Sequence, residues 1–252
     1  MCCEGAVAEP LLSLSSLSIA FGGLRAVQDV SLQVAPGTLT ALIGPNGAGK
    51  TTLFALMSGF LEPDAGTVRF DGHDITGQPP HLNARAGMTR TFQVMQPFAA
   101  QTVRENIAVG AHLREPRRAA ALAAAESIAR RVGLAPLLDK PAGDLTVAGR
   151  KRLELARALA TAPSLLLLDE FMAGLNPVET GTAMALIRRL LADGLTILMV
   201  EHIVWALMEL SRRIIVLSAG EKIAEGPPEA IAADPSVVEV YLGSDRGSPM
   251  RA

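Results

Sequence analysis

Hydrophobic and polar positions alternate along the first third of the chain. This two-residue period is typical of strands with one buried face, and turns rich in Pro, Asp and Gly separate the alternating segments. The expected strands are 11–21 (LLSLSSLSIAF), 26–34 (AVQDVSLQV), 38–43 (TLTALI), 67–70 (TVRF) and 88–93 (MTRTFQ).

The period changes to that of helices between Thr102 and Ala162, a block rich in Ala, Leu, Arg and Glu. Residues 119–125 are low in complexity, yet Leu122, Ile128 and Val132 fall on one helical face, which favours an amphipathic helix. We therefore expect a helical insertion in the middle of the chain.

Strands and helices alternate again after this block. Pro177 at the start and Gly194 at the end delimit one expected helix. Apolar strands that alternate with helices indicate a parallel sheet covered on both faces, hence an α/β fold. The expected elements are strand 164–170, helix 177–194, strand 195–200, helix 203–210 and strand 213–217.

Composition narrows the classes of function. The chain has 252 residues, 49% of them hydrophobic, and a net charge of −2. This balance provides no basic field for DNA or RNA, so we expect no nucleic-acid partner. The cluster Arg150, Lys151 and Arg152 is interpreted as a solvated helix face.

The cysteines and the longest apolar runs bear on compartment and membrane. Cys2 and Cys3 are adjacent, so no disulfide framework is expected, which fits a reducing compartment. A lipid anchor on them is the alternative, but no apolar signal region precedes them. Apolar runs such as 165–168 and 197–200 are shorter than the roughly 20 residues of a membrane-spanning helix.

The stretch GPNGAGKTT carries the first chemical signal, since it fits the G-x-x-x-x-G-K-[ST] phosphate loop between a strand and a helix. Backbone N–H groups there wrap the phosphates at a helix N-terminus. Lys50 would reach the β- and γ-phosphates, and Thr51 would hold Mg²⁺. The expected nucleotide-binding residues are Gly44, Pro45, Asn46, Gly47, Ala48, Gly49, Lys50, Thr51 and Thr52.

Two acids end the apolar strand LLLLDE. Carboxylates at the C-terminal end of a buried strand lie beside the phosphate loop in such a sheet. Asp169 would meet Mg²⁺ through water, and Glu170 would polarise the attacking water. The alternative is a pair of surface acids, which four preceding leucines disfavour. These two motifs alone are equally compatible with kinases, GTPases and helicases.

The segment LTVAGRKRLELARALA (145–160), upstream of LLLLDEFMAGLNP, distinguishes among these classes. From Leu12 to Leu242 the chain resembles the ABC-transporter ATPases, whose signature Leu-Ser-Gly-Gly-Gln opens a helix before the acidic strand. The resemblance implies a RecA-like P-loop NTPase core with a mostly parallel sheet, an N-terminal antiparallel β subdomain and an inserted helical subdomain. One ATP-binding domain then spans 11–242: core 11–93 and 160–242, helical subdomain 94–159, and disordered tails 1–10 and 243–252.

The resemblance also implies roles for single residues. Phe21 would stack on adenine, Gln93 would contact Mg²⁺ and couple to membrane subunits, and His202 would contact the γ-phosphate. Asn176 lies in the loop that crosses the dimer seam, where many relatives have Asp. Without the resemblance, a core aromatic, a surface glutamine and a structural histidine are the ordinary interpretations of the first three.

The signature departs from the family pattern. It reads Leu145, Thr146, Val147, Ala148 and Gly149, so a hydroxyl remains but both central glycines are replaced. A positive-φ backbone at Val147 or Ala148 would be strained, while Gly149 restores some freedom. This departure leaves open a weakly hydrolysing, regulatory cassette.

The family works as a dimer in which each ATP lies between one subunit's phosphate loop and the partner's signature. The resemblance therefore implies ATP and Mg²⁺ as ligands, and a second ATP-binding subunit and two transmembrane permease subunits as partners. Segment 94–103 would dock the permeases through Met95 and Phe98, although both are equally candidates for core residues.

Several segments, among them FGGLRAVQDVS, DEFMAGLNPVET and VEHIVWALMELS, resemble the ATP-binding subunits of bacterial branched-chain amino acid importers. Such a subunit lies at the cytoplasmic face of the inner membrane, held by its permeases, and a solute-binding protein acts indirectly. Relatives import urea, amides or other small organic solutes, or export lipopolysaccharide. Soluble ABC ATPases of translation or DNA repair usually have two cassettes or a long coiled coil, which this sequence lacks.

Overall fold

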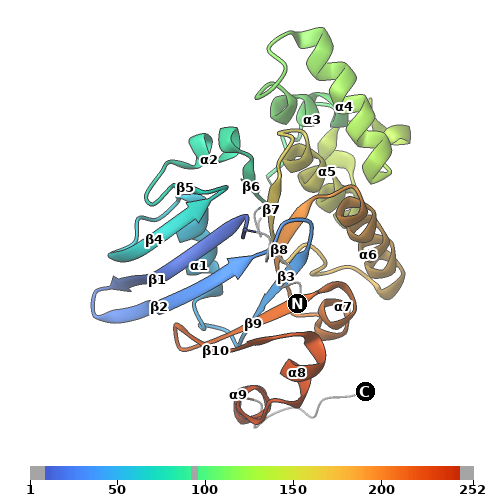
Figure 1. The fold of residues 1–252 in the computed structure, drawn as a ribbon. Helices are drawn as coiled ribbons and strands as arrows, with labels where there is room; N and C mark the ends of the chain where they lie inside the picture. Colours follow the sequence, from blue (N-terminus) through green and yellow to red (C-terminus); the bar gives the residue numbers. More distant parts are fainter. Residues whose placement is uncertain (1–8, 92–95, 245–252) are drawn as a thin grey trace, which may run out of the picture.

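A computed structural model describes residues 9–91 and 96–244, with side chains to residue 240. The larger sheet has the strand order β10–β9–β3–β8–β7–β6 (Figure 1), parallel except for β10, which pairs antiparallel with β9. The expected α/β fold with a mostly parallel sheet is confirmed. Its strands are β3 (Leu39–Ile43), β6 (Met88–Arg90), β7 (Leu165–Asp169), β8 (Thr196–Val200), β9 (Arg213–Ser218) and β10 (Glu221–Gly226).

An antiparallel sheet with the order β2–β1–β4–β5 lies beside it, at the left of Figure 1. In β1, Leu12, Leu14 and Leu17 are buried while Ser15 and Ser16 are exposed, so one face packs inward. The strands are β1 (Leu12–Phe21), β2 (Leu24–Val34), β4 (Ala65–Phe70) and β5 (His73–Asp74).

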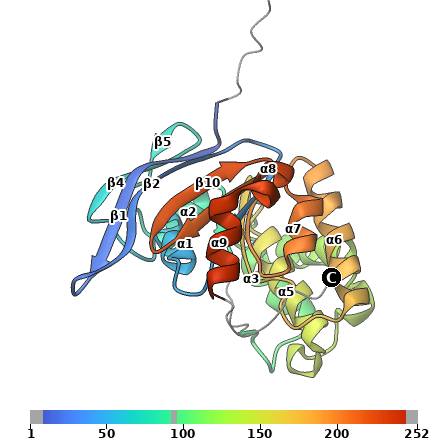
Figure 2. The same ribbon diagram turned by 90° about the horizontal axis from the view of Figure 1, so that it is seen from below.

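Helices cover both faces of the larger sheet. Seen from below (Figure 2), α1 and the antiparallel sheet lie on one side, and α5, α6 and α7 lie on the other. The helices are α1 (Lys50–Ser58), α2 (Pro80–Ala86), α3 (Val103–Ala111), α4 (Arg118–Val132), α5 (Val147–Leu159), α6 (Pro177–Ala192), α7 (Val204–Leu210), α8 (Pro228–Ala233) and α9 (Pro235–Ser244).

The two-residue period of β7 divides the hydrophobic core into two clusters. Leu166 and Leu168 belong to the cluster with α3–α6, whereas Leu165 and Leu167 belong to the cluster with α1 and the antiparallel sheet. Every residue of this strand is buried, which explains its uninterrupted apolar sequence. The acids that follow are thereby held at a fixed edge of the sheet.

Some elements were not predicted from the sequence. The edge strand β10 reads EKIAEG and has little apolar signal, because it pairs only with β9 in the described sheet. Helices α2 and α8 are short and were missed. Helix α9 continues to Ser244, two residues beyond the domain end expected at residue 242. In the described ranges, no helix has the length and hydropathy that a bilayer crossing requires.

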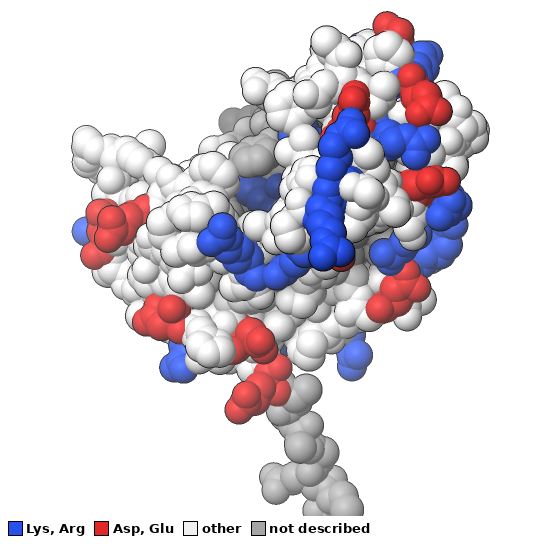
Figure 3. Space-filling model, turned by 90° about the horizontal axis from the view of Figure 1, so that it is seen from above, with Lys and Arg blue, Asp and Glu red and all other residues white. Residues whose placement is uncertain are grey.

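Charge is unevenly distributed on the surface in spite of the small net value. Viewed from above (Figure 3), Lys and Arg side chains run beside a hollow in the middle of the molecule, whereas acidic side chains lie mainly at the periphery. The interpretation of Arg150, Lys151 and Arg152 as a solvated face is wrong for Lys151, which is 8% exposed. Its Nζ donates a hydrogen bond to the carbonyl oxygen of Glu170 inside the molecule.

Candidate functional site

The loop between β3 and α1 requires glycine. Gly44, Gly47 and Gly49 have φ values of +154°, +80° and +97°. A Cβ atom at Gly44 would lie 2.2 Å from the carbonyl oxygen of Leu217, and one at Gly49 would lie 2.3 Å from that of Ala26. The loop can therefore keep this tight path only without side chains at these positions, and it leads directly into the N-terminus of α1.

Lys50, the first residue of α1, folds back over this loop. Its Nζ donates hydrogen bonds to the carbonyl oxygens of Gly44 at 2.6 Å and Pro45 at 2.9 Å. Burial lowers the pKa of Lys50, while the charges of Glu170 and Asp169 raise it. An ammonium group is thus held above the loop where an anion would lie.

An open pocket of about 680 Å³ collects residues from five parts of the chain. Gly44 and Pro45 lie outside its lining and act through their contacts with Lys50. Leu24 and Arg25 were not predicted, although they follow Phe21 in the same hairpin and share its position at the pocket. The lining residues are Phe21, Leu24, Arg25, Ala26, Asn46, Gly47, Ala48, Gly49, Lys50, Thr51, Thr52, Glu170, His202 and Ala219.

Glu170 and His202 meet in this pocket, although 31 residues separate them in the sequence. The Oε1 atom of Glu170 lies 2.9 Å from Nε2 of His202. Glu170 has a φ of +49°, a left-handed conformation that costs a non-glycine residue free energy and is often found at functional sites. Its N–H donates to the carbonyl oxygen of Val200, which anchors it to β8.

Asp169 contacts a residue that was not predicted. Its Oδ2 accepts a hydrogen bond from the guanidinium of Arg90 at 2.8 Å, and both side chains are buried. Because β6 and β7 are parallel neighbours, their carboxyl ends meet at this edge. The pattern MTR alone does not reveal the pairing, which depends on the strand order.

The expected magnesium ligands form an incomplete set within the described residues. Thr51 is exposed in the pocket, Asp169 has one oxygen on Arg90, and Gln93 lies outside the described residues. No cluster of three or more metal-binding His, Cys, Asp or Glu side chains occurs in 9–91 and 96–240. A hydroxyl and one carboxylate fit a Mg²⁺ ion that takes most of its ligands from phosphate and water.

The signature loop forms the start of α5. Thr146 is the N-cap, and its Oγ1 accepts a hydrogen bond from the N–H of Gly149 at 3.2 Å. Val147 and Ala148 lie in the first helical turn, so the strain considered for a positive φ there does not arise. Val147 is 51% exposed, and residues 145–149, all of them described, do not line the pocket.

Two other candidates have local explanations. Asn176 is the N-cap of α6, and its Oδ1 accepts from Glu179 N at 3.0 Å while Glu179 Oε2 accepts from Asn176 N. Phe98 is 44% exposed, with the Arg157 guanidinium 5.1 Å from its ring centre. Met95 lies outside the described residues.

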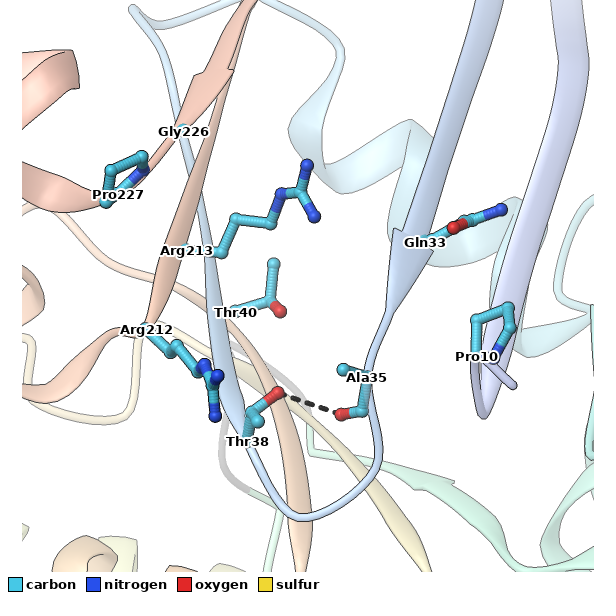
Figure 4. A pocket seen from close by; sticks show the side chains of 9 residues that line it. All are labelled: Pro10, Gln33, Ala35, Thr38, Thr40, Arg212, Arg213, Gly226 and Pro227. Carbon is cyan, nitrogen blue, oxygen red and sulfur yellow. Dashed lines mark hydrogen bonds between the residues drawn. The ribbon is translucent and has the colours of Figure 1, made fainter. Parts of the chain in front are cut away.

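A second pocket, of about 280 Å³, lies at the other end of the parallel strands, by the amino ends of β3 and β9 (Figure 4). The guanidinium of Arg213 points into it, and its Nε pairs with Glu225 at 2.8 Å. Thr38, Thr40 and Arg212 come from the amino ends of β3 and β9. Ligands of α/β sheets bind at the carboxyl ends, so the larger pocket is the candidate site.

Comparisons with known proteins agree with this geometry. Residues 27–173 match the family model for "ABC transporter", and residues 221–246 match the model for "Branched-chain amino acid ATP-binding cassette transporter". The chain is 39% identical to the branched-chain amino acid transport ATP-binding protein BraF of Pseudomonas aeruginosa and 40% identical to LivG of Escherichia coli. Each alignment covers 94% of this chain and 99% of the relative.

Solved structures give the same result at the level of the fold. An ATP-binding cassette of an ABC transporter, MJ1267 in its ADP conformation, superposes with a TM-score of 0.85 at 32% identity. The match covers 93% of this chain and 99% of that one.

Proposed function

Since this chain belongs to the ABC transporter family of ATP-binding cassettes, we propose that it is the ATP-hydrolysing subunit of an importer for branched-chain amino acids. The observation that carries the proposal is the pocket in which the phosphate loop, Glu170 and His202 meet. The cargo is inferred from the carboxyl-terminal family match and from the named transport role of the relatives.

The nucleotide would lie with its phosphates on the phosphate loop. N–H groups at the start of α1 and the ammonium of Lys50 are donors suited to the β- and γ-phosphates. Phe21, 48% exposed at the pocket, offers its ring to adenine.

Hydrolysis requires a water molecule attacking the γ-phosphorus while the bond to the β–γ bridging oxygen breaks. Glu170 would orient and polarise that water. His202, whose Nε2 lies 2.9 Å from Oε1 of Glu170, would hold the carboxylate and contact the γ-phosphate. ADP and phosphate then leave, with the proton of the water passing to phosphate. Lys50 stabilises the charge on the transferred group.

Mg²⁺ would neutralise phosphate charge in this site. Thr51 would ligate it directly, and Gln93 and Asp169 would contact it, Asp169 through water. For this, Asp169 would use the oxygen that is not bonded to Arg90 or would exchange that pairing.

The signature loop of one subunit would contact the ATP of a second ATP-binding subunit. Thr146 retains an O–H donor for this role, because its bond with Gly149 uses only acceptor capacity. Asn176 would lie near the same seam. Closure around ATP and reopening after hydrolysis would then drive two permease subunits docked near residues 94–103, with a solute-binding protein acting from the other side.

In this proposal the subunit would lie at the cytoplasmic face of the inner membrane, held there by its permeases. This location is inferred from the transport role of the relatives.

The test of the proposed chemistry is Glu170→Gln. We expect ATP hydrolysis by the assembled transporter to fall by roughly 10²- to 10⁴-fold, since the substitution removes the water-polarising carboxylate. ATP affinity should remain, because the phosphate loop is intact. Exposed Glu239→Gln is the matched control. Unchanged turnover in Glu170→Gln would refute the assignment.

The cargo needs its own test. ATP hydrolysis by the transporter in vesicles, with its solute-binding protein, should increase with leucine, isoleucine or valine and not with urea. Stimulation by urea alone would assign the chain to a different importer.

A further inference from the structure

Lys151 is a buried cation on α5 that contacts the segment 170–172, the start of the loop after β7. It is 8% exposed, and its Nζ donates a hydrogen bond to the carbonyl oxygen of Glu170 at 2.7 Å. Its neighbour Arg150 instead bonds the carbonyl oxygens of Gly143 and Leu145. Lys151 therefore connects the helix that begins at the signature loop to the residue proposed to polarise water.

Glu201 holds the same loop from the other side. It follows β8, is 3% exposed, and its Oε1 accepts the N–H of Met172 at 2.5 Å. His202, the contact of the Glu170 carboxylate, is the next residue in the chain. Residues 170–172 are thus fixed by a cation from α5 and an anion from the end of β8.

Packing alone does not explain why the ionisable side chains of Lys151 and Glu201 are buried here. Desolvating a charge costs several kcal/mol, and apolar residues often provide equal or better stability at such positions. The loop they hold contains the left-handed Glu170, whose carbonyl oxygen also accepts the N–H of Ala173 at 3.2 Å. Such a conformation persists only where its surroundings fix it.

We propose that Lys151 and Glu201 are positioning residues for ATP hydrolysis. They hold the backbone of residues 170–172, thereby direct the Glu170 carboxylate, and connect it to the helix that carries the signature loop. The inference rests on the proposed function, because it assigns these residues a role at the same site.

Electrostatics supports this geometry. The pKa of Glu201 is raised to about 7, chiefly by burial and also by the charge of Glu170, against the N–H of Met172, the charge of Lys151 on α5 and the N–H of His202. Burial also lowers the pKa of Lys151, against the charges of Glu201, Glu154 and Glu170. Glu201 therefore gains a proton as the pH falls through about 7, which weakens its attraction to Lys151.

The first experiment compares Lys151→Met with Lys151→Arg in the assembled transporter. We expect the methionine variant to lower kcat roughly tenfold to a hundredfold, as small misplacements of a catalytic group do, with ATP affinity retained. Arginine, which keeps the charge and donors, should recover most of the rate. Exposed Lys140→Met is the matched control.

A double-mutant cycle separates this inference from the proposed function. If Lys151 acts through Glu170, Lys151→Met should change the residual rate of Glu170→Gln little. A full kcat in Lys151→Met, or an additive loss in the double variant, overturns the inference. A fast Glu170→Gln enzyme would instead overturn the proposed function.

The second experiment measures kcat against pH for Glu201→Gln between about pH 6 and pH 8, a range around the raised pKa of Glu201. Wild type and Glu239→Gln should lose activity as the pH falls below about 7, and Glu201→Gln should lack this step. An identical profile in all three proteins assigns the step to another group and overturns the role of Glu201. This comparison decides the question even where Lys151→Met does not fold.

Discussion

At the scale of single residues, the site depends on backbone conformations that few residue types adopt without strain. Gly44 and Gly49 are required because a Cβ atom would meet a backbone carbonyl at about 2.2–2.3 Å. Glu170 adopts a positive φ although it carries a side chain. A carboxylate in a strained position, supported by Val200, Lys151 and His202, is consistent with a group oriented for chemistry.

Lys50 is the residue on which nucleotide affinity should depend most directly. Lys50→Ala should weaken ATP binding at least about tenfold, because it removes the ammonium group and with it a charge-assisted hydrogen bond to the β- and γ-phosphates. Isothermal titration calorimetry measures this effect, with exposed Lys140→Ala as the control. Wild-type affinity in Lys50→Ala would contradict the assigned role.

At the scale of elements, two residues to which the family resemblance assigns only a functional role also have a structural role at a helix N-terminus. Thr146 caps α5 and Asn176 caps α6 within a capping box. A hydroxyl or amide at these positions satisfies N–H groups that the helix leaves unpaired. The signature loop therefore tolerates Val147 and Ala148, because its backbone is already helical there.

The cap on α6 gives a stability prediction. Asn176→Ala should lower the free energy of unfolding by about 1 kcal/mol, the usual value of an N-cap, measured by urea denaturation. Asn176→Asp should retain stability, since aspartate also caps and its charge is favourable at a helix N-terminus. If both variants are as stable as wild type, the cap contributes nothing measurable.

At the scale of the whole molecule, the fold brings several distant segments into one pocket but leaves the signature segment, residues 145–149, outside that pocket. Residues from the β1–β2 hairpin, the phosphate loop and the ends of β7 and β8 line the pocket, but residues 145–149 do not. The exposed Val147 at the start of α5 is then free to meet another subunit. A signature loop that lies outside the pocket and is exposed is what we expect if ATP bridges two subunits, as proposed.

The bridge predicts association that depends on ATP. With Glu170→Gln, which should bind ATP without rapid hydrolysis, light scattering should show dimers with ATP and monomers without it, or a heterodimer when the partner cassette is present. Thr146→Val, which removes the donor O–H, should reduce the association. A chain that stays monomeric with ATP and all plausible partners present would contradict the proposal.

The sequence by itself determined the alternation of strands and helices, the phosphate loop and the acidic end of β7, because local patterns encode these features. Leu165–Leu168 and GPNGAGKTT can each be recognised within a window of a few residues. The resemblance of residues 145–160 to a signature added the family, which geometry alone does not name.

Only the tertiary structure decided which distant residues meet. Arg90 reaches Asp169 because β6 and β7 are neighbours, and Lys151 is buried against Glu170 although its sequence context is basic and polar. Contacts of this kind depend on strand order and helix packing, which a short sequence window does not contain. The polar residues that support the site are therefore the ones that sequence patterns miss.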